Sequence, residues 1–279
     1  MIRSCLFIPA NNPGMLQTAD LFMADSVIFD LEDAVSIEEK DAARTLLAGF
    51  LQNFTVNAKI IVRINNNPLW FLQDLETVVT ERLDAVLIPK ADHDSLEKTK
   101  LILTRLEKER CLAKKISVIP LIETAAAVMQ VEDILARPRI IGVMLGAEDL
   151  TADMEIDRSK SGEEILYPRM KIALVARAYR LVAIDTPFVD VNDEEGLIKD
   201  ATVARKLGMT AKAAIHPRQV TTINRVFSPT AAQIIWAQRV LAKSATSQGA
   251  FSLDGKMIDQ PIVERAKKTI EKAKRYNLI

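Results

Sequence analysis

Carboxylates follow three apolar runs of the sequence, each at the point where the run ends. These acids are Asp30, Glu32, Asp33, Glu123, Glu148 and Asp149. If the runs are strands of one sheet, the carboxylates converge at one edge. They then repel one another unless a cation or fixed Arg and Lys charges neutralise them. Oxygen ligands with open coordination positions suit Mg²⁺ or Mn²⁺. The pattern therefore predicts a divalent-metal site.

Eight apolar runs alternate with helical patterns and must position these acids. We expect strands over residues 5–9, 26–33, 59–65, 85–90, 117–123, 140–146, 186–191 and 211–216. An irregular loop over 150–161 and a helix over 163–181 should precede the seventh strand. Eight such units are typical of an α/β fold of the (β/α)8 TIM barrel type, whose carboxyl-terminal mouth carries the active site. An open, doubly wound sheet is the alternative, but Pro9–Gly14 lacks its glycine-rich first turn.

The last fifty residues lie outside this alternation. We therefore predict two domains, a barrel with the metal site over 1–227 and a C-terminal helical extension over 228–279. The extension should contain a helix that ends at Leu241, a turn over 251–261 and a final helix over 263–276. A tail of this kind can act as a lid or reach a neighbouring subunit.

Composition excludes several classes of protein. Lys plus Arg and Asp plus Glu both total 37, and no basic stripe is interleaved with aromatic residues, which argues against nucleic acid as a partner. No apolar run approaches the roughly 18 to 20 residues of a membrane span, and the start of the chain does not resemble a signal peptide. We expect a soluble, cytoplasmic protein. Cys5 and Cys111 are expected to be reduced, structural thiols, and two histidines are too few for a three-histidine zinc site.

Six segments together resemble the citrate lyase β-subunit and its relatives, the HpcH/HpaI aldolase and citrate lyase family of CoA-ester lyases. They are Phe29–Val35, Val62–Asn65, Leu121–Thr124, Leu145–Asp149, Ala214–Arg218 and Gly255–Asp259. The resemblance extends from about residue 3 to residue 265. It implies a Mg²⁺-dependent retro-Claisen cleavage of a 3-hydroxyacyl thioester. The products would be a 2-oxo acid and acetyl-CoA, or acetyl bound to a carrier protein.

The same resemblance implies roles for four residues. Glu123 and Asp149 match the metal ligands, and Glu123 would also contact the substrate and take part in catalysis. Arg63 matches the residue that binds the substrate and stabilises the enolate oxygen of the leaving acetyl thioester. Asp259 matches the acid or base that exchanges the proton at the acetyl carbon, and in relatives it arrives from an adjacent subunit.

Further substrate contacts are implied for Asp30, Arg3 and His216. Asp30, like Glu32 and Asp33, would hold metal-bound water or the Arg63 guanidinium. Arg3 would contact the cofactor phosphates, and His216 would lie near the thioester arm. Structural alternatives stay open, because these acids can pair with barrel cations, His216 can be a satisfied strand-end residue and Asp259 can cap a helix. Glu148 is expected to point away from Asp149, and Lys90 is either a solvated rim charge or part of the site.

Four functions are consistent with these residues. The first is a free-standing acyl-CoA lyase for citramalyl-, malyl- or citryl-CoA, assembled as a homo-oligomer such as a trimer or hexamer. The second is the β-subunit of a citrate lyase complex, which would take its acyl group from a carrier protein. The third is a barrel without turnover, and the fourth is a 2-oxo-acid aldolase that does not need CoA.

Overall fold

The chain falls into two compact units, which are described separately. The computed structural model describes residues 2–247 and 249–279, and the units comprise residues 2–224 and 225–279. In the described residues no helix combines the length and the apolar character that crossing a membrane requires.

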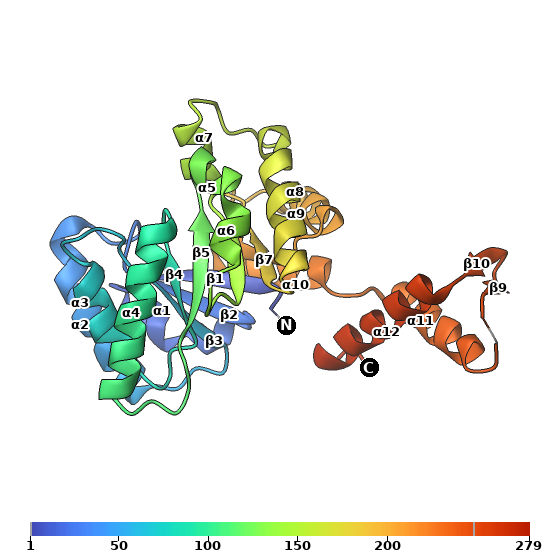
Figure 1. Cartoon of the computed structure of the whole chain (residues 1–279), viewed down its shortest axis with the longest axis horizontal. Helices are drawn as coiled ribbons and strands as arrows, with labels where there is room; N and C mark the ends of the chain where they lie inside the picture. The colour runs from blue at the N-terminus through green and yellow to red at the C-terminus, as the bar shows by residue number, and fades with distance from the viewer. Residues whose placement is uncertain (1, 248) are drawn as a thin grey trace. The chain divides into compact units, whose positions relative to one another are not determined.

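Eight parallel strands form a closed barrel in the first unit (Figure 1). They are β1 (Ser4–Pro9), β2 (Ser26–Asp30), β3 (Lys59–Arg63), β4 (Ala85–Ile88), β5 (Ser117–Ile122), β6 (Gly142–Leu145), β7 (Val182–Asp185) and β8 (Ala211–Ala214). Strand β1 pairs with both β2 and β8, which closes the sheet. The predicted (β/α)8 barrel is therefore confirmed.

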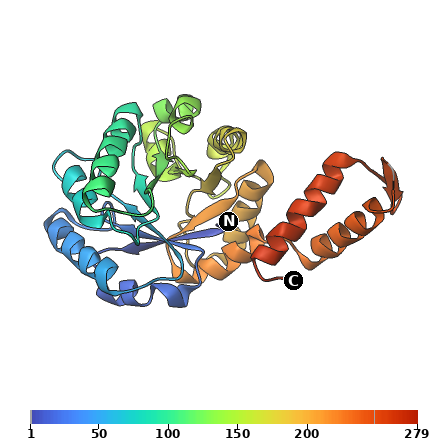
Figure 2. The ribbon, with the colours of Figure 1, turned by 60° about the horizontal axis from the view of Figure 1, so that its bottom comes forward.

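Helices cover the outside of the barrel between successive strands (Figure 2). They are α1 (Pro13–Gln17), η1 (Ala19–Phe22), η2 (Ile37–Glu39), α2 (Lys40–Asn53), α3 (Phe71–Val78), α4 (His93–Glu109), α5 (Ala125–Met129), α6 (Val131–Leu135), α7 (Ala147–Asp153), η3 (Glu163–Ile165), α8 (Leu166–Ala178), α9 (Glu194–Leu207) and α10 (Pro217–Phe227). Strand side chains alternate between the two faces, and one buried cluster collects Ile28, Ile61, Ile119 and Met144 from four strands. These residues fill the barrel, so the carboxyl ends of the strands are left to carry chemistry.

The seventh strand lies earlier in the chain than predicted. Strand β7 covers Val182–Asp185 instead of 186–191, because helix α8 ends at Ala178 and not at residue 181. Helix α8 is ended by Arg180, whose φ of 60° is left-handed. The N–H of the following residue, Leu181, donates to Ala176 O at 2.8 Å. Glycine normally occupies this position of a helix end. An arginine there gives no stop signal in the sequence, which explains the error.

The acids that follow β6 lie in a helix and not at a strand end. Helix α7 begins at Ala147, so Glu148 and Asp149 belong to its first turn, and part of the predicted loop 150–161 is helical. Carboxylates are favourable at the amino-terminal turn of a helix. The two side chains diverge, since Glu148 Oε1 lies 3.4 Å from Arg158 Nε while Asp149 pairs with Lys90.

A buried cluster of four charges joins β7 and β8 to the helices outside them. Lys212 Nζ lies 2.6 Å from an oxygen of Asp185 and 2.6 Å from one of Asp200. Arg169 on α8 contacts the same two carboxylates at 2.8 and 2.6 Å. The Arg169 and Lys212 side chains are fully buried. Two cations therefore balance two anions in a region without solvent.

The second unit is a helical hairpin with a small β-hairpin at its turn. It contains α11 (Ala231–Ser244), β9 (Phe251–Leu253), β10 (Lys256–Ile258) and α12 (Gln260–Arg275), and α10 leads into it. The predicted turn over 251–261 is thus two antiparallel strands. Asp254 and Gly255 connect them with φ values of 51° and 72°, as tight hairpins require. The unit has its own core, which includes Ala237, Val240 and Ile258.

Candidate functional site

Arg63 is held by three carboxylates at the carboxyl ends of β2 and β3. Its Nε and Nη2 donate to the two oxygens of Asp30 at 2.7 and 2.6 Å. Its Nη1 donates to Asp33 at 3.1 Å and lies 3.0 Å from Glu32 Oε2. Burial would lower the pKa of Arg63, but the bonds to Asp30 and the surrounding negative charge outweigh it and raise the pKa. The guanidinium is therefore a fixed, permanent positive charge.

Asp30 orients Arg63 and also shapes the turn that carries Glu32. Asp30 and Arg63 are partners in the register of β2 and β3, and Asp30 is 1% exposed. The Asp30 carboxylate accepts the N–H groups of Glu32 at 2.9 Å and Ala34 at 3.0 Å. These bonds satisfy a buried carboxylate on both oxygens. The predicted role of Asp30 in holding Arg63 agrees with this geometry.

Lys40, which the sequence did not single out, and Asn65, the last residue of the Val62–Asn65 segment, fix the same turn. Lys40 Nζ donates to the carbonyl oxygens of Leu31 and Glu32 at 2.8 and 2.5 Å. Asn65 Nδ2 also donates to Leu31 O at 2.8 Å, and Asp74 in turn accepts from Asn65. Lys40 is 6% exposed although it begins an outer helix. No sequence motif identifies such a contact, because it depends on how α2 packs on β2.

Glu123 follows β5 and is buried at the mouth, with 3% of its surface exposed. Its Oε1 accepts the Lys90 N–H at 2.6 Å. Gly146 lies so near that a Cβ there would stand 2.6 Å from Glu123 Oε2 and 2.8 Å from Glu123 Cβ. Burial raises the pKa of Glu123 to about 7, aided by the charge of Asp149 and opposed by the Lys90 N–H. Burial therefore disfavours the charged form of Glu123 even though the charges of Arg63 and Lys90 favour it.

Asp149 and Lys90 face each other across the rim beside Glu123. Lys90 Nζ lies 3.6 Å from Asp149 Oδ1, with the two side chains 60% and 44% exposed. Burial disfavours the charged form of Lys90, but the charges of Asp149, Glu123 and Glu32 outweigh it and raise the pKa. Lys90 is therefore part of the charge cluster and not an isolated rim residue.

Glu32 adds a third carboxylate whose charge is poorly compensated. Burial raises the pKa of Glu32 to about 8, although Arg63 opposes this shift. Its Oε2 is buried and accepts no hydrogen bond from any described residue, despite lying 3.0 Å from Arg63 Nη1. The negative charges of Asp33, Glu123 and Asp30 add to this upward shift of the Glu32 pKa. A buried carboxylate oxygen that accepts no hydrogen bond is a candidate contact for a hard divalent cation or for its bound water.

A metal ion at this mouth would need further ligands from the substrate or from water. Within residues 2–247 and 249–279, no three His, Cys, Asp or Glu side chains are arranged to enclose a metal ion. Glu123 and Asp149 would contribute oxygens, and substrate and water would complete the shell. Open positions of this kind are what a catalytic Mg²⁺ site needs, because the reacting molecule must reach the metal.

Three further predicted residues lie apart from this cluster or in the other unit. Arg3 precedes β1 at the opposite end of the barrel, where its N–H and its guanidinium bind Asp25 at 2.7 to 2.8 Å. His216 follows β8 at the carboxyl-terminal mouth, and its Nδ1 accepts the Arg218 N–H at 3.2 Å. Asp259 belongs to the second unit, where it caps α12 by accepting the Ile262 N–H at 3.4 Å.

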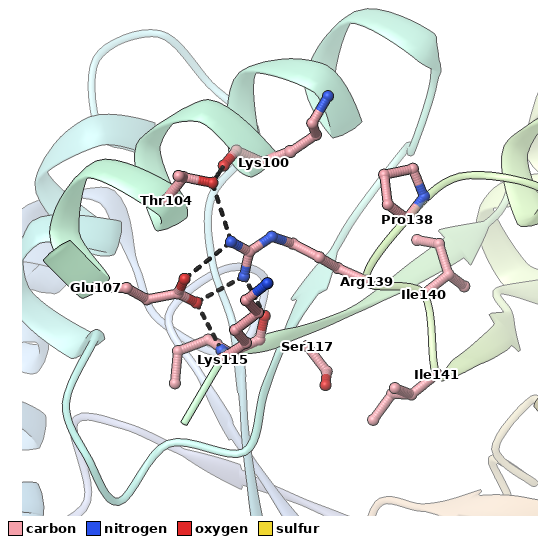
Figure 3. A pocket seen from close by; sticks show the side chains of 10 residues that line it. Lys100, Thr104, Glu107, Lys115, Ser117, Pro138, Arg139, Ile140 and Ile141 are labelled. Atoms are coloured by element: carbon pink, nitrogen blue, oxygen red, sulfur yellow. Dashed lines mark hydrogen bonds and ion pairs between the residues drawn. The ribbon is translucent and has the colours of Figure 1, made fainter. Parts of the chain in front are cut away.

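A hollow of about 510 Å³ lies at the amino-terminal end of β5 and contains none of the predicted residues (Figure 3). Figure 3 shows the Arg139 guanidinium between Glu107 and Thr104 of α4. Arg139 Nη1 and Nη2 donate to Glu107 at 2.6 and 2.8 Å, and Nη2 donates to Thr104 at 2.9 Å. These bonds neutralise the arginine and tie the loop before β6 to α4, so its role is structural.

Comparison with known proteins agrees with this geometry. The chain is 39% identical over 283 residues to citrate lyase subunit beta of Haemophilus influenzae, with 98% of this chain and 97% of that protein covered. It is 30% identical over 290 residues to the mitochondrial citramalyl-CoA lyase of Rattus norvegicus, with 96% and 85% covered. The crystal structure of CitE from Mycobacterium tuberculosis in complex with magnesium, acetoacetate and coenzyme A matches with a TM-score of 0.80 and 30% identity, covering 98% of both chains. The HpcH/HpaI aldolase/citrate lyase family matches residues 3–217, and the chain belongs to that family.

Proposed function

We propose that this protein is a Mg²⁺-dependent carbon–carbon lyase that cleaves a 3-hydroxyacyl thioester into acetyl-CoA and a 2-oxo acid. The observation that carries the proposal is that Arg63, Glu123 and Asp149 lie on one barrel mouth, where Asp30 fixes Arg63 and burial raises the pKa of Glu123. The named relatives support it, since they include a citramalyl-CoA lyase and a CitE structure with magnesium and coenzyme A. Mn²⁺ has similar ligand preferences and is a candidate substitute.

Glu123 and Asp149 would hold the metal, which when bound supplies Lewis-acid polarisation of the substrate hydroxyl and carboxylate. The substrate hydroxyl would give its proton to water at the open mouth, and its oxygen would become the ketone oxygen of the 2-oxo acid. The adjacent carbon–carbon bond breaks, and its electrons form the enolate of the acetyl thioester. Arg63 would stabilise the enolate oxygen, because Asp30 holds the guanidinium rigidly and Nη1 is directed to the rim.

Proton delivery to the acetyl carbon completes the reaction, and we assign it to Asp259. This residue lies between β10 and α12 and caps the helix, so its backbone is held on both sides. We propose a homo-oligomer, a trimer or hexamer, in which Asp259 reaches the barrel mouth of a neighbouring subunit.

His216, which follows β8, would contact the thioester arm. Arg3 is not assigned to the cofactor phosphates, because it pairs with Asp25 at the other end of the barrel. A cytoplasmic location is also proposed.

A second candidate is the β-subunit of a citrate lyase complex, which would release oxaloacetate and leave acetyl on a carrier protein. The higher identity to citrate lyase subunit beta, 39% against 30% for the citramalyl-CoA lyase, favours it. This candidate uses the same residues and the same chemistry. It differs in the molecule that carries the thioester.

Release of acetyl-CoA from citramalyl-, malyl- and citryl-CoA, measured in parallel with Mg²⁺ and with EDTA, tests both candidates. Metal-dependent cleavage of one thioester establishes the free-standing lyase and identifies its substrate. No cleavage by a folded protein that binds Mg²⁺ favours the carrier-bound substrate. Glu123→Ala and Asp149→Ala should abolish cleavage without unfolding the barrel, and full activity in either variant would refute the site.

A further inference from the structure

Lys90 contacts both proposed metal ligands through different atoms. Its backbone N–H donates to Glu123 Oε1 at 2.6 Å. Its ammonium lies 3.6 Å from Asp149 Oδ1, and the anions that act on it most strongly are Asp149, Glu123 and Glu32. A single residue therefore contacts the carboxylates that follow β5 and β6.

The backbone of Lys90 is held in an unusual conformation that makes both contacts possible. Its φ of 46° is left-handed, which residues with a Cβ rarely adopt. The turn is bound on both sides of Lys90, since Asn66 Nδ2 donates to Pro89 O at 2.9 Å and the Ala91 N–H donates to Leu121 O at 3.3 Å. Strained conformations that the surroundings enforce are frequent at functional sites. A solvated rim lysine would need neither the strain nor the two contacts.

We propose that Lys90 is a positioning residue that prepares the metal site: its N–H fixes Glu123, and its ammonium neutralises Asp149 until Mg²⁺ displaces it. This inference rests on the proposed function, because it takes Glu123 and Asp149 as the ligands. The ammonium and the metal compete for one carboxylate, so the free enzyme binds Mg²⁺ more weakly than the carboxylates alone would. The displaced ammonium then faces the anionic substrate. Metal and 2-oxo acid therefore bind cooperatively.

Direct titration of Mg²⁺ by calorimetry tests the competition without relying on activity. Lys90→Met should lower the Mg²⁺ Kd by about tenfold, because a nearby positive charge that opposes the metal is removed and solvent screens it only partly. Lys59→Met is the matched control. Lys59 is 64% exposed and pairs with Asp84 at 3.2 Å at the amino end of β3, so the variant has the same charge change away from the mouth. Its Mg²⁺ Kd should equal that of the wild type.

Lys90→Gly distinguishes the effect of the Lys90 ammonium from the effect of its backbone N–H. Glycine adopts a φ of 46° without strain and keeps the N–H that binds Glu123. This variant should fold even if Lys90→Met does not, and it should show the same tighter Mg²⁺ binding. A Kd within twofold of the wild type in both variants, or weaker binding in both, overturns the inference. Wild-type protein that binds no Mg²⁺ would instead remove the proposed function, and this inference with it.

Repeating the titrations with oxaloacetate present tests the fate of the displaced ammonium. The factor by which oxaloacetate tightens Mg²⁺ binding should be larger in the wild type than in Lys90→Met and Lys90→Gly. Lys59→Met should keep the wild-type factor. If oxaloacetate lowered the Mg²⁺ Kd by the same factor in all four proteins, the ammonium would not contact the substrate. That result would overturn this part of the proposal.

Discussion

Gly146→Ala should weaken Mg²⁺ binding although it alters no ligand. Backbone conformation does not explain why position 146 is a glycine, since any residue can adopt its φ of −101°. The constraint is steric, because an added Cβ would stand 2.6 Å from Glu123 Oε2 and 2.8 Å from Glu123 Cβ. Rotation of the carboxylate relieves only the first contact. The second requires the Glu123 main chain or the start of α7 to move.

The size of the effect follows from these distances. To reach van der Waals contact, Glu123 must retreat by about half an ångström or more, which stretches its 2.6 Å bond from the Lys90 N–H. Overfilling a packed site costs about 1–3 kcal/mol of stability. Misplacing a metal ligand through its supporting contacts typically costs about 10- to 100-fold in affinity. We expect a Mg²⁺ Kd raised within that range, with the fold retained.

Calorimetric titration of Mg²⁺ and thermal unfolding measure the two effects. Gly49→Ala is the matched control, because Gly49 lies inside α2 and a Cβ there meets nothing within 4 Å. That variant should keep the wild-type Mg²⁺ Kd and gain about 0.5–1 kcal/mol of stability from its helix. An unchanged Mg²⁺ Kd in folded Gly146→Ala would show that Glu123 is not a ligand or that its position is not held by packing.

Four other substitutions test separate parts of the structure. Lys212→Met leaves one buried cation for two carboxylates and should cost about 3–5 kcal/mol, measured by urea unfolding. Burial opposes the charged form of Asp200, but Lys212 and Arg169 outweigh it and lower its pKa below the ordinary 3.8. The ionised Asp200 carboxylate therefore stabilises the fold at any pH above its ordinary pKa of 3.8. This stabilisation is lost as the pH falls through the lowered pKa of the folded state. Asp200→Asn should flatten this acid limb of the stability profile, and an unaltered limb would exclude Asp200 as its source. Asp30→Asn should loosen Arg63 and lower kcat/KM about tenfold or more while Mg²⁺ binding persists. Asp259→Ala should slow turnover without changing the Mg²⁺ Kd, and unchanged turnover would leave Asp259 as a helix cap.

The sequence predicted the barrel because alternation of apolar runs and helical patterns survives small errors in boundaries. It misplaced β7 because Arg180 ends α8 in a left-handed conformation that glycine usually adopts, so no stop signal precedes Val182. It also missed the hairpin over 251–258, although Asp254-Gly255 is a favourable tight turn. The strands there are three residues each, too short for a periodic pattern. Both errors concern local backbone geometry and leave the topology unchanged.

The site was predictable only as a set of acids at strand ends. Strand order brings Asp30, Glu123 and Asp149 to one mouth, and that order follows from the barrel. The partners of each acid do not follow, because they depend on rotamers and on helix packing. Lys40 reaches the turn after β2 from an outer helix, and Lys90 turns its N–H inward through a left-handed φ. Neither lysine differs in sequence from an exposed surface charge.

The carboxylates at the mouth divide into two groups by the charge that compensates them. Both oxygens of Asp30 accept hydrogen bonds from Arg63 and from backbone N–H groups, so the negative charge of Asp30 is compensated. Glu123 and Glu32 are also buried, and burial raises their pKa to about 7 and about 8 although the charge of Arg63 opposes both shifts. The first group therefore fixes the arginine to which we assign stabilisation of the enolate. In the second group burial disfavours the charged forms, and a divalent cation at the proposed site would compensate them without disturbing the arginine. One mouth would then hold a permanent charge for the transition state and an exchangeable one for the substrate.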